Sequence, residues 1–165
     1  MHYLNNLWAA LDFGSLWDML LRLAAVLLCL TVHETCHGLA AYALGDPTAR
    51  QAHRLSLNPL WHIDWFGLLM MFLAGFGWAK PVPVNPNYFK KPKQGMALTA
   101  LAGPMSNFLL AFIMLLGARI FCDVASYSEA NQRILDFILM VAILSIGLGL
   151  FTRVPIPPLD GSKVL

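Results

Sequence analysis

The amino-acid sequence predicts an all-α integral membrane protein with about three transmembrane helices and a re-entrant loop or hairpin. Hydrophobic residues make up 58% of the 165 residues and charged residues only 12%, whereas a soluble domain has about 25% charged residues. The hydrophobic residues also gather in long stretches that polar or proline-rich segments separate. Because this length suits one domain, we expect residues 1–165 to form a single membrane-embedded unit.

The first apolar stretch, residues 16–44, is interrupted only by Asp18, Arg22 and one polar cluster. A helix of this length can cross a hydrocarbon core of about 30 Å. Gly45 and Pro47 follow directly, and this pair is typical of a helix end. We therefore predict a first span that ends near residue 44.

The second apolar stretch, residues 66–79, is too short to span and contains three glycines. Residues 80–95 carry several prolines, which remove backbone donors and disfavour helical neighbours. We interpret 66–95 as a membrane-dipping loop or hairpin followed by a polar connection.

Two further stretches, 97–118 and 134–151, are predicted to be transmembrane helices because they are long and almost entirely apolar. Pro104 is expected near the start of the first of these, where proline is tolerated. The chain then continues through the sequence VPIPPLDGSKVL.

The basic residues predict the topology. Residues 46–96 hold Arg50, Arg54, Lys80, Lys90, Lys91 and Lys93, whereas residues 119–133 hold only Arg119 and Arg133. The positive-inside rule places the first connection in the cytoplasm. The first span then ends, and the last span returns, at the same membrane face. No basic run with interleaved aromatic residues is present, so nucleic acid is not an expected partner.

His33-Glu34-Thr35-Cys36-His37 forms an HExxH sequence within the first predicted span. Residues four apart share a helix face, so the two imidazoles can hold one Zn²⁺ while Glu34 serves as the general base toward a water molecule. Ionisable groups within a span are costly and usually functional, which favours this interpretation over a chance match.

A catalytic zinc needs a third protein ligand, and the residues leave three candidates. Asp46 lies in a Gly-Asp-Pro turn, Asp64 in a loop, and Asp160 in the rigid proline-rich segment 154–161. Spacing alone favours Asp160 only modestly, because an aspartate before Gly-Ser also suits a helix N-cap.

Two other polar side chains lie near the predicted spans. Cys29 precedes His33 by one helical turn, and burial as a small apolar side chain explains it better than metal ligation. Asn107 could donate a hydrogen bond to a developing oxyanion in a substrate-binding site. An interhelical hydrogen bond is an equally good explanation of Asn107.

Together these motifs resemble the site-2 protease family of intramembrane zinc metalloproteases, in its compact bacterial form without a PDZ domain. The resemblance rests on His33-Glu34-x-x-His37 and on the later Pro155-Ile156-Pro157-Pro158-Leu159-Asp160-Gly161. It also rests on GDPTA (45–49), LSLNPLWHID (55–64), GWAKPVPVNP (77–86) and ALAGPMSN (100–107). The ordered set extends from about residue 25 to the end of the chain.

The resemblance implies that His33, His37 and Asp160 bind Zn²⁺ and that Glu34 is the base. It implies hydrolysis of peptide bonds in membrane-anchored protein substrates, as in regulated intramembrane proteolysis, with region 66–95 near the substrate path. We therefore expect a multi-pass protein of a bacterial cell membrane, surrounded by the lipid bilayer, with its active site toward the cytoplasmic side.

Two features depart from the family pattern. Thr152, followed by Arg153, stands where the family usually has an asparagine, which bears on substrate handling. The chain stops at Leu165, where family members continue into a further helix, so we expect either a shortened chain or a compact member. A non-proteolytic membrane metal-binding or regulatory protein is therefore the alternative. A metal transporter is a third hypothesis, and the sequence does not specify an oligomeric state.

Overall fold

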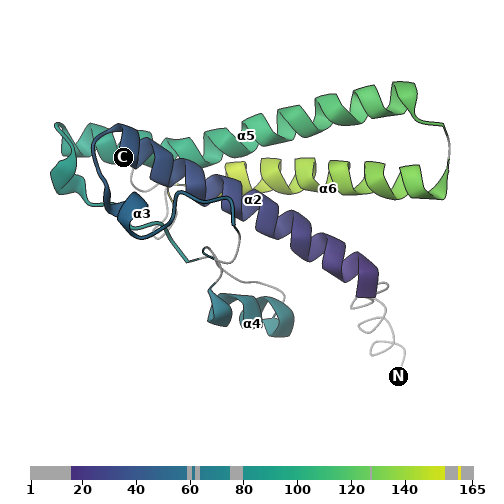
Figure 1. Ribbon diagram of the computed structural model, residues 1–165, viewed down its shortest axis with the longest axis horizontal. Coiled ribbons are helices and arrows are strands. Elements are labelled where there is room, and N and C mark those ends of the chain that lie inside the picture. The colour runs from purple at the N-terminus through teal and green to yellow at the C-terminus, as the bar shows by residue number, and fades with distance from the viewer. Residues whose placement is uncertain are drawn as a thin grey trace.

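The computed structural model describes residues 16–58, 61, 64–74, 80–126, 128–154 and 160. Within these ranges every regular element is a helix, which confirms the predicted all-α class. Figure 1 shows their order, which is α2 (Leu16–Ala43), α3 (Thr48–Gln51), α4 (Trp65–Ala74), the 3-10 helix η2 (Pro86–Tyr88), α5 (Pro92–Val124) and α6 (Glu129–Phe151).

Three of these helices are long and apolar enough to cross a membrane, namely Trp17–Ala43, Pro92–Val124 and Glu129–Phe151. At a rise of 1.5 Å per residue they extend roughly 35 to 50 Å, which exceeds a hydrocarbon core of about 30 Å. Only 28%, 17% and 22% of their most apolar windows are buried inside the protein. The remaining apolar side chains therefore face outward, as they do in a helix surrounded by lipid.

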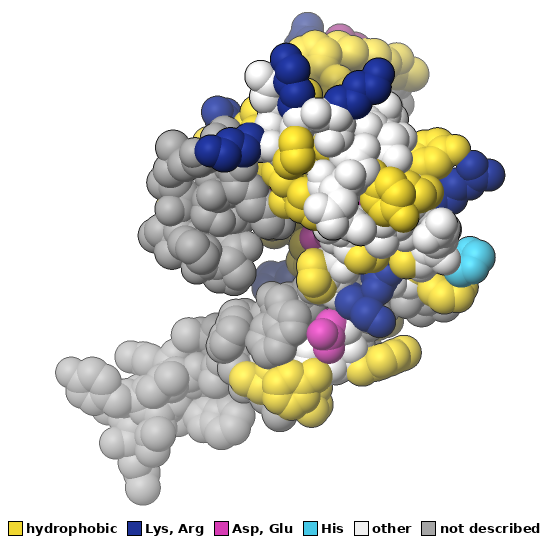
Figure 2. Space-filling view, turned by 90° about the vertical axis from the view of Figure 1, so that its left-hand side faces the viewer, with side chains coloured by type: hydrophobic (Ala, Val, Ile, Leu, Met, Phe, Trp, Pro, Cys, Tyr) yellow, Lys and Arg dark blue, Asp and Glu magenta, His cyan; other side chains and the backbone are white. Residues whose placement is uncertain are grey.

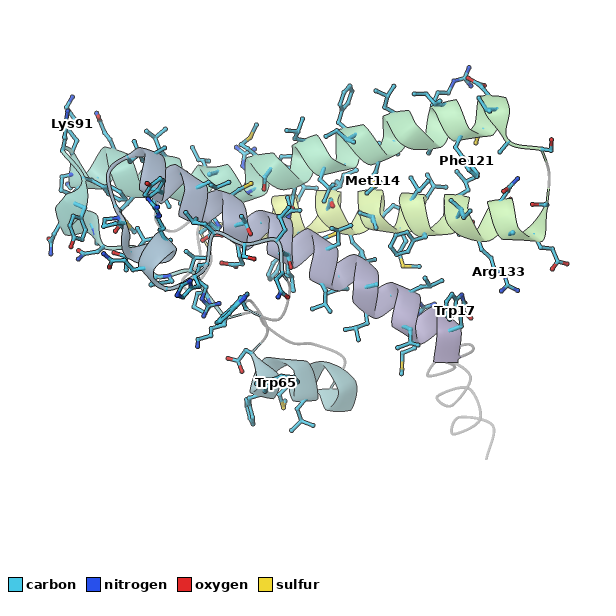
Figure 3. All side chains as sticks on the ribbon, in the orientation of Figure 1. Trp17, Trp65, Lys91, Met114, Phe121 and Arg133 are labelled. Carbon is cyan, nitrogen blue, oxygen red and sulfur yellow. The ribbon has the colours of Figure 1, made fainter. Side chains whose placement is uncertain are left out.

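The spans form a bundle in which α5 and α6 run antiparallel side by side and α2 packs against both (Figure 1). Its buried centre holds Ala25 and Cys29 of α2 and Val141 of α6, with larger side chains from α5 and α6 around them. Met114 of α5 is one of these and lies between α5 and α6 (Figure 3). Small residues at this centre let the helix backbones approach closely, which favours helix association in a membrane.

Both later spans begin earlier than the apolar pattern predicts. The helix expected over 97–118 starts at Pro92, because proline is well suited to the first helical turn. The helix expected over 134–151 starts at Glu129, after Ser128 whose hydroxyl accepts a hydrogen bond from the N–H of Asn131. Polar flanks thus extend both helices beyond their apolar segments.

The expectation that Pro104 lies near a helix start is wrong. It lies twelve residues beyond Pro92, in the interior of α5, where its side chain is fully buried. A proline there removes one helical hydrogen bond, and packing against the other spans compensates for that loss in membrane helices.

Residues 66–95 are only partly as expected. They include α4, a segment without regular secondary structure over 80–85 and η2, but residues 92–95 already belong to α5. Helix α4 stands apart from the other described helices and exposes Trp65 (Figures 1 and 3). Residues 75–79 lie outside the described ranges, so the re-entrant hairpin stays a prediction.

Basic residues lie at the two ends of the bundle. Lys91 lies at the end where α2 finishes and α5 begins, and Arg133 lies at the opposite end (Figure 3). Figure 2 views the first end and shows several lysine and arginine side chains there. The described arrangement agrees with the separation of basic residues on which the predicted topology rests.

Candidate metal centre

Helix α2 presents His33 and His37 on one face because four residues complete about one helical turn. Both are buried inside the protein, with exposed fractions of 2% and 6%. Their Nε2 atoms lie 3.0 Å apart, and the rings meet edge to face with 4.6 Å between centroids. In this arrangement the Nε2 atoms of both imidazoles point toward a common position.

Asp160 completes this cluster from the far end of the chain. Its Oδ2 atom lies 3.1 Å from Nε2 of His33 and 3.0 Å from Nε2 of His37. The three donor atoms all lie within 4.8 Å of one another. The structure therefore brings together the three predicted ligands, although Asp160 follows His37 by 123 residues in sequence.

The cluster fits a tetrahedral zinc ion. Zinc bonds of about 2.0–2.1 Å place neighbouring donor atoms roughly 3.3 Å apart, and two histidines with one carboxylate are a known catalytic donor set. The observed separations of 3.0 to 3.1 Å are slightly smaller, so a small opening of the side chains would admit the ion. Three protein donors leave the fourth tetrahedral position for water or substrate.

The partner of His37 on α5 selects its protonated nitrogen. Nδ1 of His37 lies 2.7 Å from the backbone carbonyl oxygen of Thr99. A carbonyl only accepts, so Nδ1 carries the proton and donates it. Nε2 is then left with a lone pair toward Asp160 and His33, which is the form that binds a metal.

Asn107, also on α5, contacts the second ring nitrogen of His33. Its side chain is completely buried, and its amide nitrogen lies 3.2 Å from Nδ1 of His33. Its Oδ1 atom has no hydrogen-bond partner in the described structure. Because the amide oxygen and nitrogen exchange places on a half rotation, Oδ1 can face Nδ1 instead and accept a hydrogen bond from its N–H. This orientation leaves Nε2 of His33 free to bind a metal. The predicted oxyanion role of Asn107 stays a prediction.

Glu34 lies next to this cluster on α2 and is half-buried. Its Oε2 atom accepts a hydrogen bond of 3.2 Å from the backbone N–H of Val82. The segment 80–85 therefore passes beside the predicted base. Thr35, one residue further, donates to the carbonyl of Ser56 at 3.1 Å and ties the loop after α3 to α2.

Gly103 is a site residue whose role sequence reasoning missed. A Cβ atom at this position would fall within 2.7 Å of Nε2 of His33 and even closer to Nε2 of His37. Only glycine leaves room for the two imidazoles against α5. A sequence signal did exist, because Gly103 precedes Asn107 by four residues and so shares its helix face.

The other acidic candidates have different partners. Asp46 is fully buried and accepts hydrogen bonds from the N–H and hydroxyl of Thr48 and, at 2.7 Å, from the N–H of Asn85. Burial alone would raise the pKa of Asp46, but these hydrogen bonds outweigh burial and hold that pKa below its ordinary value. Asp64 instead accepts from the N–H groups of Phe66 and Gly67 at the start of α4.

Two remaining predictions concern Cys29 and Thr152. The Sγ atom of Cys29 lies 3.2 Å from Oγ of Ser145 in the bundle centre, and Cys29 is absent from the described donor cluster. The hydroxyl of Thr152 donates to the carbonyl of Leu148 at 2.8 Å, within the end of α6. It is therefore engaged locally. Residues 155–159 and 161, which complete the proline-rich motif, lie outside the described ranges.

An all-α membrane bundle with two histidines and an aspartate converging inside it defines a membrane protein with a candidate metal centre. The chain is 41% identical over 140 residues to a Bacillus subtilis protein named "Putative zinc metalloprotease YwhC", across 82% of this chain and 63% of the relative. It is also similar to the Rip2 proteins, which share that description. Identity is 27% over 151 residues in Mycolicibacterium smegmatis and 29% over 150 residues in Mycobacterium tuberculosis.

The match covers most of this chain but less of its relatives. It includes 88% and 87% of this chain for the two Rip2 proteins, but only 56% and 55% of their own lengths. The chain thus spans less than two thirds of the curated relatives it matches. No family model matches the chain. No solved structure matches it significantly.

Proposed function

We propose that this chain is an intramembrane zinc metalloprotease, of the site-2 protease type, that hydrolyses peptide bonds of membrane-anchored protein substrates. The observation that carries the proposal is the convergence of Asp160, from the segment after α6, on His33 and His37 of a candidate span, beside Glu34. The names of the relatives imply Zn²⁺ as the ion and proteolysis as the reaction.

The site residues divide the chemistry between them. Zinc supplies Lewis acidity, which activates water and polarises a carbonyl. His33, His37 and Asp160 would hold the ion with one position open. Glu34 would accept the proton of the attacking water and return it to the leaving amine nitrogen, as a general base and then a general acid.

The substrate must be locally unfolded before it can react. A spanning helix satisfies its amides internally, so its peptide carbonyls are not accessible to attack. The segment 80–85 passes beside Glu34, with the N–H of Val82 hydrogen-bonded to its carboxylate. We propose that this segment pairs with the extended substrate through backbone hydrogen bonds, which adds a strand to an exposed edge.

The proposed location is a bacterial cell membrane, crossed by α2, α5 and α6. The basic residues at the end where α2 finishes and α5 begins support a cytoplasmic position for that end. His37 precedes the last residue of α2 by six positions, or roughly 9 Å along the axis. The centre would thus lie within the bilayer, toward its cytoplasmic side.

The test uses the full chain, purified in detergent and returned to lipid, with zinc content and cleavage of a single-span model substrate as separate readouts. We expect Glu34→Gln to keep zinc and lose cleavage by about 10²- to 10⁴-fold. Asp160→Asn should lose zinc. The matched controls Glu129→Gln and Asp136→Asn change exposed carboxylates of α6 and should retain both properties. A native chain that binds zinc and cleaves nothing would favour the non-proteolytic metal-binding protein instead.

A further inference from the structure

A cavity of about 470 Å³ opens at the end of the bundle where α2 finishes. It is formed by the last turns of α2, by α3 and by the loop that follows α3. Its walls include Leu39, Tyr42, Arg50, His53, Leu55 and Trp61. Aliphatic, aromatic and cationic side chains thus share one cavity.

This cavity is separate from the candidate metal centre. Each residue of an α-helix advances about 100° around the axis. Leu39 and Tyr42 therefore lie roughly opposite His33 and His37 on α2. Because α2 itself stands between them, a ligand in the cavity would not reach the metal ligands.

The cation in the cavity is held in place by an aromatic neighbour. Nη1 of Arg50 donates to the hydroxyl of Tyr42 at 2.5 Å, and the guanidinium carbon lies 5.3 Å from the centroid of the same ring. Arg50 is exposed, and among the described residues this is its one side-chain hydrogen bond. A planar guanidinium fixed in this way matches the oxygen atoms of a phosphate.

Another part of the cavity wall comes from the loop after α3. His53 adopts a φ of 55°, in the left-handed region that non-glycine residues seldom occupy. Its ring lies 5.8 Å from the ring of Trp61, centroid to centroid. The guanidinium of buried Arg54 donates to the carbonyl of Trp61 and holds that residue to the loop.

The location of the cavity and the basic residues around it indicate which ligand it would bind. It adjoins the end of a candidate span, where the aliphatic side chains of Leu39 and Leu55 can contact an acyl chain and tryptophan and tyrosine are typical of the membrane interface. Exposed basic residues surround this end (Figure 2). The carboxylates of Asp46 and Asp64, which flank the cavity's loop in sequence, are already hydrogen-bonded to backbone N–H groups. We infer that this cavity binds the phosphate headgroup of an anionic phospholipid, with Arg50 as its main contact.

Binding of a short-chain phosphatidylglycerol to the full chain in neutral detergent tests the inference, measured by native mass spectrometry and by titration. Arg50→Gln should weaken binding about fivefold or more, since a basic residue near an anionic surface contributes about that factor. The matched control Arg119→Gln removes an exposed arginine at the opposite end and should leave binding unchanged. Trp61→Ala should also weaken binding while zinc content stays the same.

Two competing ligands distinguish a lipid headgroup from a soluble phosphate. Inorganic phosphate at millimolar concentration should not displace the lipid, and phosphatidylcholine of the same chain length should bind more weakly than phosphatidylglycerol. Equal loss of binding in Arg50→Gln and Arg119→Gln would show a diffuse charge effect and overturn the inference. Displacement by inorganic phosphate would equally overturn it, because the site would then belong to a soluble anion. Circular dichroism and gel filtration verify that each variant remains folded.

Discussion

Asn107 of α5 and His33 of α2 meet in the bundle interior, with 3.2 Å between the amide nitrogen and Nδ1. The backbone carbonyl oxygen of Thr99, also on α5, lies 2.7 Å from Nδ1 of His37. Both candidate histidine ligands thus have their second nitrogen held by α5. Such outer partners fix the ring orientation and the tautomer of a metal-binding histidine.

Replacing Asn107 with alanine should weaken zinc binding by about 10- to 100-fold, the usual effect of losing such a partner. Asn107→Asp should retain more affinity than Asn107→Ala, because an ionised carboxylate only accepts hydrogen bonds and can accept one from the Nδ1–H of His33. Competition with a zinc chelator measures both affinities. Asn87→Ala, an exposed change outside the bundle, is the control. If Asn107→Asp binds zinc more weakly than Asn107→Ala, the assigned orientation of the amide is wrong.

Much of the bundle was predictable from composition and periodicity. Apolar stretches identify α2, α5 and α6 because a span must be long and uncharged. Their ends were harder to predict. Hydropathy falls at Lys93 and again at Arg119, yet α5 includes both residues since a helix continues as long as its backbone bonds are satisfied. Pro92 and Ser128, as helix-starting residues, were the signals that would have located the true starts.

The candidate site was predictable where its residues are close in sequence. His33 and His37 follow from the helical spacing, whereas spacing left Asp46, Asp64 and Asp160 open. The three-dimensional partners separate them, because Asp46 and Asp64 accept from nearby backbone N–H groups and only Asp160 reaches the histidines. Which residues of α5 touch the site depends on helix packing, which no local pattern contains.

Gly103→Ala should disturb the candidate centre without adding charge or polarity. The new methyl group would overlap both imidazoles, so the rings must move or α5 must shift. We expect zinc affinity to fall at least tenfold, because misplaced donors no longer match a tetrahedral ion. Gly117→Ala is a matched control on the same helix, since its Cβ would meet nothing within 4 Å. Equal zinc affinity in both variants would show that the contact is unimportant.

Asp46 should make the loop after α2 sensitive to acid. Its folded pKa is depressed, so its stabilising effect is present above the unfolded pKa of about 3.9 and is lost as the pH falls through the lower folded value. Hydrogen exchange at the N–H of Asn85, which Asp46 binds at 2.7 Å, should accelerate relative to its intrinsic rate in that acidic range. In Asp46→Asn this acceleration should disappear. A native chain whose Asn85 protection is constant down to pH about 2 would contradict this prediction.

Removal of the metal should destabilise the bundle, because the candidate ligands come from α2 and from the segment after α6. An ion that binds only the folded chain stabilises it by about 2.7 kcal/mol when its free concentration is 100 times its dissociation constant. A chelator should therefore lower the unfolding temperature of the native chain, and equally that of Glu34→Gln, in which all three ligands remain. Asp160→Asn should unfold at the same temperature with or without the chelator. A chelator effect that persists in Asp160→Asn would mean that another group completes the site. Asp160 would then not be a metal ligand, whatever its effect on cleavage.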